Sequence, residues 1–127
     1  DLGNSCLFSV LSTASSFESS SAIMHNKFVV ADENIVWTGS TNWSDTEAGG
    51  YNANLAVVVK SKEIAKAYTL EFEAMLSGKF HEFKQQEHRE KSSNKYDLDS
   101  GNVKVYFSPQ DTPIQNAIIP LIQNSKK

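Results

Sequence analysis

The sequence predicts an α/β fold in which a mixed sheet is flanked by helices. Three observations support this class. Residues 22–31 and 34–38 are rich in β-branched and apolar side chains, residues 54–60 contain a continuous apolar run, and residues 61–76 carry apolar side chains at helical spacing. A chain of 127 residues is long enough for one domain with a modest core and, at most, part of a second one.

The first two apolar segments predict a β-hairpin. Asp32, Glu33 and Asn34 lie between them and are residues that favour turns. Residues 4–21 precede the hairpin and contain eight serines interleaved with Leu, Phe and Val. This segment fits two interpretations equally well, a disordered stretch or a strand and loop that lead into the hairpin.

A loop, a buried strand and a helix are predicted next. Residues 45–50 form the loop, and the apolar run within residues 54–60 predicts a strand that is buried on both faces. Ser61 is the expected N-cap of a helix that ends before Ser77 and Gly78. The helix has an apolar face that we expect to form core, made of Ile64, Ala65, Tyr68, Phe72, Met75 and Leu76.

The remainder of the chain is polar at first and then apolar again. Residues 79–102 are charged and read as a linker that could be helical over 81–90, and residues 103–109 predict a strand. Thr112 is the expected N-cap of a last helix, with Pro113 at its first position, and Pro120 should kink or end it. The apolar pattern of this helix consists of Ile114, Ala117, Ile118, Leu121 and Ile122.

The predicted hairpin carries side chains that suit a phosphate ester. His25 and Lys27 are two residues apart, so on a strand they share one face and form a compact cationic pair. Such a pair suits a phosphate better than a metal ion, because the ammonium group repels a cation. Gly39 would let the backbone approach a ligand closely, while Ser40 and Asn42 can donate hydrogen bonds to phosphoryl oxygens.

The order and spacing of these residues resemble the HKD signature of the phospholipase D superfamily. That signature reads His-x-Lys, four residues, Asp, six residues, Gly-Ser, and Asn two residues after Ser. Every position is matched without a change of spacing, by His25, Lys27, Asp32, Gly39, Ser40 and Asn42. In a weaker form the resemblance extends over residues 20–80. It implies a phospholipase D-like lobe and phosphodiester hydrolysis or transfer through a phosphohistidine.

The resemblance also implies roles for the matched residues. His25 would attack phosphorus, and a second His would protonate the leaving oxygen and then activate water or an alcohol. Lys27 and Asn42 would bind the non-bridging oxygens, with Ser40 supporting them. Asp32 completes the set of catalytic candidates, although its position after the strand suits a residue that orients structure rather than one that takes part in the chemistry. Members of this family generally need no metal or other cofactor.

One acidic residue of the family pattern has no counterpart here. Many relatives carry an acidic residue in an Asn-x-Glu-Asn context that hydrogen-bonds the motif His, but residues 51–54 read Tyr-Asn-Ala-Asn. Asn52 or Asn54 could accept the imidazole N–H instead. Glu47 and Asp45 are acidic residues nearby, although their spacing does not fit the pattern.

The family works with two facing motifs, and this sequence contains one. His81 and His88 are not followed two residues later by Lys. The second motif would therefore come from a homodimer partner or from the rest of a longer chain. The segment from residue 103 resembles the beginning of a second repeat. The sequence thus predicts a lobe over residues 1–80, a polar linker over 81–102 and the start of a second repeat over 103–127.

Composition limits the function classes without choosing one substrate. The net charge of −3 provides no overall basic surface for nucleic acid, although a local cleft can still be basic. The single cysteine, Cys6, excludes an internal disulfide. The expected substrate is a phosphodiester of either a nucleic acid or a phospholipid. A different class of function is a non-catalytic lobe that binds phosphate or a partner, which the missing Glu and the missing second motif both favour.

Overall fold

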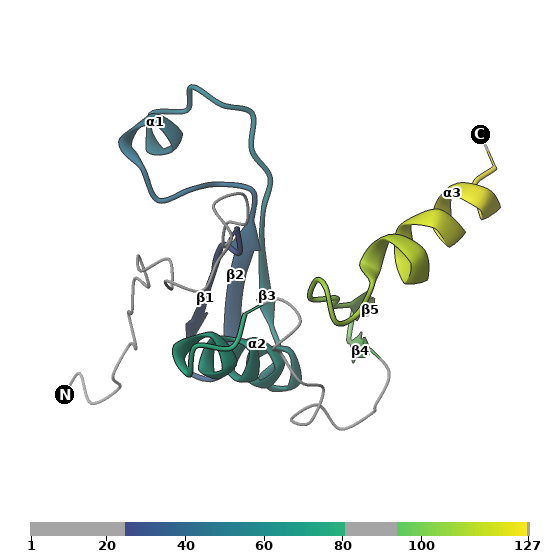
Figure 1. The fold of residues 1–127 in the computed structure, drawn as a ribbon. Coiled ribbons are helices and arrows are strands. Elements are labelled where there is room, and N and C mark those ends of the chain that lie inside the picture. Colours follow the sequence, from purple (N-terminus) through teal and green to yellow (C-terminus); the bar gives the residue numbers. More distant parts are fainter. Residues whose placement is uncertain (1–24, 81–93, 127) are drawn as a thin grey trace. The chain divides into compact units, whose positions relative to one another are not determined.

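The computed structural model describes residues 25–80 and 94–126 of the chain (Figure 1). The chain divides into two compact units, Asp1–Thr69 and Leu70–Lys127, which are described separately below. Strands and helices occur in both units, so the predicted α/β class is confirmed. Every strand pairing within the described ranges is antiparallel, whereas the sequence predicted a mixed sheet.

The first unit is built on a three-stranded sheet. Its strands are β1 (Phe28–Ala31), β2 (Ile35–Gly39) and β3 (Ala56–Lys60), and they lie in the order β1-β2-β3 with β2 in the centre (Figure 1). The predicted hairpin is thereby confirmed, with its first strand beginning at Phe28. Residues 25–27 precede the strand, and residues 22–24, like the serine-rich segment 4–21, lie outside the described residues. The pairing of β1 with β2 brings the two ends of the sequence motif together, because Phe28 lies opposite Thr38.

The turn of this hairpin has the geometry that matches the twist of antiparallel strands. Asp32 and Glu33 have φ angles of 51° and 50°, and the N–H of Asn34 donates to the carbonyl oxygen of Ala31 at 3.1 Å. Two consecutive residues with positive φ are typical of a type I′ turn. The prediction of a turn at these residues is confirmed.

The helix that follows β3 is also as predicted. Helix α2 spans Lys62–Leu76, and the hydroxyl oxygen of Ser61 accepts the N–H of Ile64 at 3.3 Å, which caps the first turn. Gly78, with φ of 79°, follows its last turn. The prediction for Leu76 was wrong, because its side chain is 56% exposed. It stands in the last turn of α2, beyond the buried Met75.

The first half of α2 contributes to the core of the first unit. The rings of Phe28 and Tyr68 meet edge to face with centroids 5.0 Å apart, which joins β1 to α2. Val36 is fully buried in the central strand, and Ile64 and Ala65 are buried on the helix. This packing joins the strands that carry the motif to α2.

Two predictions between β2 and α2 need correction. Strand β3 is not buried, as the 66% exposure of Val58 shows. The reason is that β3 is the edge strand of an antiparallel sheet and pairs only with β2. The predicted loop at residues 45–50 contains a short helix, α1 (Asp45–Ala48), in the connection between β2 and β3 (Figure 1). Ser44 is its N-cap and accepts the N–H of Glu47 at 3.5 Å. The pattern Ser-x-x-Glu is a known helix-start signal that explains this difference.

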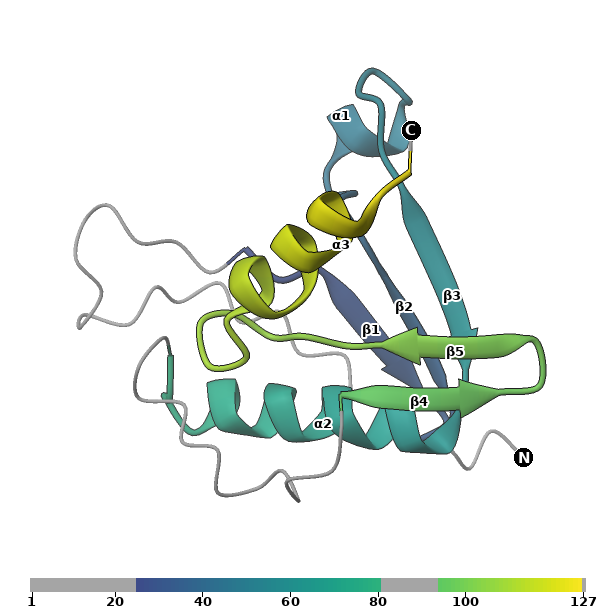
Figure 2. The same cartoon turned by 90° about the vertical axis from the view of Figure 1, so that its right-hand side faces the viewer.

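The second unit contains a hairpin and a helical segment (Figure 2). Strands β4 (Lys95–Leu98) and β5 (Gly101–Lys104) pair antiparallel. This hairpin was not predicted, because residues 95–102 were assigned to a polar linker. The strand predicted over 103–109 ends at Lys104, and the helix predicted over 81–90 lies outside the described residues. Val105 and Phe107 follow β5 and are buried.

The last helical segment begins at Pro113, as predicted. The carbonyl oxygen of Thr112 accepts the N–H of Asn116 at 3.0 Å, and a π-helical turn, η3 (Ile114–Ile118), leads into α3 (Ile119–Asn124). Thr112 has a φ of 42° and its hydroxyl accepts the side-chain amide of Asn116 at 2.7 Å instead of a backbone N–H. Pro120 does not end the helix, since the chain stays helical through Asn124, and the π-helical turn η3 lies just before this proline. None of the described helices is long and apolar enough to span a bilayer.

Candidate phosphate-binding site

Most of the predicted motif converges on one pocket of the first unit. The pocket has a volume of about 420 Å³ and lies where β1 begins and β2 ends. Its lining consists of His25, Lys27, Thr38, Gly39, Ser40, Leu55 and Val57. Two chain segments separated by about a dozen residues therefore meet here because the β1–β2 hairpin places them side by side.

The approach to β1 is tied to the sheet through the backbone of Lys27. The hydroxyl of Thr38 donates to the carbonyl oxygen of Lys27 at 3.0 Å. The ammonium group of Lys27 in turn donates to the carbonyl oxygen of His25 at 2.9 Å. Both residues precede β1, which begins at Phe28, and both line the pocket, with His25 exposed.

Ser40 connects the end of β2 to the segment that leads into β3. Its hydroxyl donates to Oδ1 of Asn54 at 2.9 Å and accepts the N–H of Leu55 at 3.0 Å. The backbone N–H of Ser40 also donates to the carbonyl oxygen of Leu55 at 2.9 Å. Ser40 is therefore held by three hydrogen bonds. Its hydroxyl donates one and accepts one, and its backbone N–H donates the third.

Glu47 is the residue on which the polar groups of the site meet. Its Oε1 accepts side-chain amides from Asn52 at 2.8 Å and from Asn42 at 3.3 Å, and its Oε2 accepts the amide of Asn54. Asn54 is also the partner of Ser40, so Glu47 links the two predicted phosphate-binding groups, Ser40 and Asn42, through its carboxylate. The side-chain N–H groups of Asn52 and Asn54 thus both donate hydrogen bonds to the Glu47 carboxylate.

The environment of Glu47 favours its charged form. Hydrogen bonds from Asn52 and Asn42 hold the pKa of the carboxyl below its ordinary value of 4.5. Partial desolvation opposes this, and the amide of Asn54 and the positive charge of Lys27 lower the pKa further. Glu47 is therefore an anion at neutral pH, and it interacts electrostatically with the motif lysine.

The close approach expected at Gly39 is made to the protein's own backbone. A Cβ placed on Gly39 would overlap the carbonyl oxygen of Leu55 and would lie 2.8 Å from Cα of Ala56. The glycine is thus required where β2 passes β3, and it also lines the pocket.

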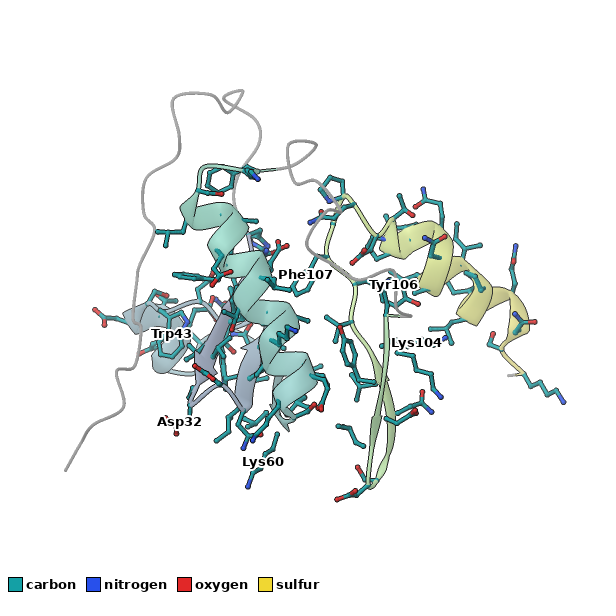
Figure 3. The ribbon with its side chains drawn as sticks, turned by 90° about the horizontal axis from the view of Figure 1, so that it is seen from below. Asp32, Trp43, Lys60, Lys104, Tyr106 and Phe107 are labelled. Carbon is teal, nitrogen blue, oxygen red and sulfur yellow. The ribbon has the colours of Figure 1, made fainter. Side chains whose placement is uncertain are left out.

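Asp32 is not brought together with the other motif residues. It lies in the turn after β1, whereas the pocket lies before β1, so the length of the strand separates the two. Asp32 is exposed and shares its end of the sheet with Lys60, the last residue of β3 (Figure 3). The structure therefore gives Asp32 a place in the turn and none at the pocket.

A second hollow is lined in part by the motif residue Asn42. It has a volume of about 360 Å³ and is lined by Trp37, Thr41, Asn42, Trp43, Ser44 and Asp45. The rings of Trp37 and Trp43 have centroids 5.2 Å apart and planes inclined by 59°. Trp43 is 68% exposed, so the aromatic wall of this hollow is open to solvent.

Glu47 is the site residue whose place the sequence analysis did not find. Its spacing from the motif did not match the family pattern, yet the Ser44-x-x-Glu47 signal places it in the first turn of α1, close behind Asn42. Across residues 25–80 and 94–126, no group of three or more His, Cys, Asp or Glu side chains is arranged to hold a metal ion.

Comparisons with known proteins agree with the motif and its surroundings. The family model described as "Cardiolipin synthase, PLD-like domain" matches residues 7–76, which is more than half of the chain. Mitochondrial cardiolipin hydrolases of Xenopus tropicalis and Xenopus laevis are each 40% identical over 58 residues, which cover 46% of this chain and 27% of each relative. The chain thus matches little more than a quarter of the length of these relatives. No solved structure matches. The family match and the spacing of the motif together show that the chain belongs to the phospholipase D-like family.

Proposed function

We propose that the chain supplies one half of the active site of a phospholipase D-type phosphodiesterase. The observation that carries this proposal is the convergence of His25, Lys27 and Ser40 on one pocket, with Asn42 joined to them through Glu47. A nucleophile, a cation and neutral hydrogen-bond donors are the groups that displacement at a phosphodiester requires.

In the proposed reaction, a ring nitrogen of His25 forms a bond to phosphorus while the bond from phosphorus to the leaving oxygen breaks. The leaving oxygen takes a proton from a second histidine, which later removes a proton from the water or alcohol that cleaves the phosphohistidine. Lys27 and Asn42 stabilise the charge on the non-bridging oxygens. Ser40 holds Asn54, and through it Glu47, in place behind them.

The second histidine is proposed to come from another copy of the motif. His81 and His88 do not stand in a His-x-Lys pattern. A homodimer would supply the second His25 across a two-fold axis, and a longer polypeptide would supply it from a second repeat. Sedimentation at several protein concentrations separates these arrangements, because activity that rises with dimer formation supports the homodimer.

For the substrate, we propose an anionic phospholipid ahead of a nucleic acid. The two Xenopus relatives are named as cardiolipin hydrolases. In addition, the net charge of −3 provides no general attraction to a polyanion such as DNA or RNA. Cardiolipin vesicles and a single-stranded oligonucleotide, offered side by side, test this choice through the products released from each.

The central experiment measures hydrolysis of a chromogenic phosphodiester by the wild type and by His25→Ala. We expect activity that persists in EDTA, is lost in His25→Ala and is kept in the control His88→Ala, which changes a histidine outside the motif. An alkali-stable, acid-labile phosphoprotein should form in the wild type and in His88→Ala, but not in His25→Ala. If the wild type binds phosphate but hydrolyses no diester, and still hydrolyses none when a second motif is present, the chain is a non-catalytic binding lobe.

A further inference from the structure

Glu47 places a negative charge at a site that is proposed to bind an anion. Its carboxylate accepts the side-chain amides of Asn42, Asn52 and Asn54, and Asn42 is one of the proposed phosphate-binding groups. A carboxylate in such a position repels phosphate, so its presence calls for a physical explanation. Helix capping does not provide one, because Ser44 caps α1 and the Glu47 side chain is turned to the asparagines.

The charges of the site nearly cancel before substrate binds. Lys27 contributes one positive charge and Glu47 one negative charge, while Ser40, Asn42 and Asn54 are neutral. The positive charge of Lys27 acts on Glu47 directly, as its contribution to lowering the Glu47 pKa indicates. With a neutral His25, this half-site has a formal charge of zero, whereas without Glu47 it would have a charge of +1.

The negative charge of Glu47 weakens the binding of a doubly charged ligand more than that of a singly charged one. A phosphodiester carries one negative charge, whereas a phosphomonoester or inorganic phosphate carries close to two at about pH 8. The Coulomb energy is proportional to the charge, so Glu47 opposes the dianion twice as strongly as the monoanion. A carboxylate at this position therefore discriminates between the two classes of phosphate.

The same carboxylate fixes the amide of Asn42. One N–H of its Nδ2 is directed at Oε1 of Glu47, which sets the plane of the amide and the direction of the second N–H of that nitrogen. A glutamine at position 47 has a single acceptor oxygen, whereas three amide donors converge on the two oxygens of Glu47. Loss of the carboxylate would therefore leave at least one asparagine amide without its acceptor.

We propose that Glu47 is a positioning and specificity residue, which orients the Asn42 amide for the transition state and selects singly charged phosphodiesters over doubly charged phosphates. This inference rests on the proposed function. Removing the carboxylate should therefore affect binding and turnover in opposite directions. Loss of the negative charge strengthens anion binding, whereas release of the Asn42 amide slows the reaction. A residue that served only to hold the fold would weaken both.

The test compares the wild type with Glu47→Gln in titrations with inorganic phosphate and dimethyl phosphate at about pH 8, followed by NMR. For unit charges several ångströms apart in a water-like dielectric, we expect Glu47→Gln to bind dimethyl phosphate about threefold more tightly and inorganic phosphate about tenfold more tightly. In the hydrolysis assay, kcat should fall about tenfold or more while KM does not rise.

Glu63→Gln is the matched control. Glu63 is also a carboxylate in the first turn of a helix, its pKa is also lowered by hydrogen bonds, and it accepts the hydroxyl of Ser61 at 2.9 Å. It follows the end of β3 that pairs with Ile35, whereas the pocket lies at the Gly39 end of the sheet. Glu63→Gln changes the net charge equally, so unchanged phosphate affinity in this variant excludes an effect of net charge alone.

Equal affinities of Glu47→Gln and the wild type, or an equal gain for both ligands, would overturn the proposal. Glu47→Ala removes the same charge and replaces the first variant if that variant does not fold, and failure of both to fold would make Glu47 a structural residue and also overturn it. The proposed function fails separately, when the wild type itself neither binds phosphate nor hydrolyses a diester.

Discussion

The hydroxyl of Ser40 donates a hydrogen bond of 2.9 Å to Oδ1 of Asn54, a residue fourteen positions further along the chain. This bond connects the Gly-Ser portion of the motif to the asparagines around Glu47. The polar site thus depends on the pairing of β2 with β3, and not only on the hairpin that carries the motif. Changes at either end of this contact should therefore affect the proposed chemistry.

Ser40→Ala should reduce activity more than it reduces stability. It removes a donor to Asn54 and an acceptor for the N–H of Leu55 in an exposed setting, where such hydrogen bonds contribute about 1 kcal/mol each. The variant should unfold at slightly lower urea concentration and hydrolyse a chromogenic diester at least about tenfold more slowly. Ser77→Ala is the control, because it removes an exposed hydroxyl that donates to the carbonyl oxygen of Ala74 at the end of α2. Equal activities of the two variants would contradict this prediction.

Asp32→Gly should leave turnover within about twofold of the wild type. Asp32 lies in the turn at the far end of β1 from the pocket, and its φ of 51° is a conformation that glycine adopts without strain. The measurement is kcat/KM, together with a thermal melt that reports the fold. A well-folded variant with a large loss of kcat would return Asp32 to the group of catalytic candidates.

Gly39→Ala should destabilise the first unit by about 1–3 kcal/mol, the usual effect of overpacking. The added methyl group would meet the backbone of Leu55 and Ala56 rather than a flexible side chain, so β2 and β3 would have to separate. Urea unfolding measures the change. Gly50→Ala provides a comparison in which nothing lies within 4 Å of the added carbon, although its φ of 74° adds backbone strain. A Gly39→Ala variant as stable as the wild type would contradict the close approach.

Glu47 should also give the chain a stability that is lost in acid. Its pKa in the folded state lies below the ordinary value of 4.5, mainly because Asn52 and Asn42 donate hydrogen bonds to the carboxylate. The unfolded chain therefore binds more protons in this range, and the stability contributed by Glu47 is present above 4.5 and is lost as the pH falls through the folded-state pKa.

Thermal melts of the wild type and Glu47→Gln over acidic pH, at low and high salt, measure this contribution. The difference between the two proteins should shrink as the pH falls. Added salt should reduce it as well, because Glu47 is accessible to solvent and part of its interaction is with the charge of Lys27. A difference that does not change with pH would show that the Glu47 carboxylate is no more acidic in the folded chain than in the unfolded one.

Local patterns were enough to predict several elements. The turn at Asp32 and the start of α2 at Ser61 depend on the backbone preferences and hydrogen bonds of neighbouring residues, which the sequence displays directly. Helix α1 was missed although its start signal, Ser44-x-x-Glu47, was present, because it has only four residues and Gly49 and Gly50 follow it. The β4–β5 hairpin was missed because its strands are short and polar.

By itself, the sequence determined the β1–β2 hairpin, helix α2 and the family, because periodicity, turn chemistry and motif spacing are properties of neighbouring residues. Only the tertiary structure decided what meets at the site. The pairing of β2 with β3 brings Asn54 to Ser40, the fold of α1 brings Glu47 to Asn42, and the length of β1 keeps Asp32 away. These relationships depend on strand register and on the path of a connection, and contacts between residues distant in sequence determine both.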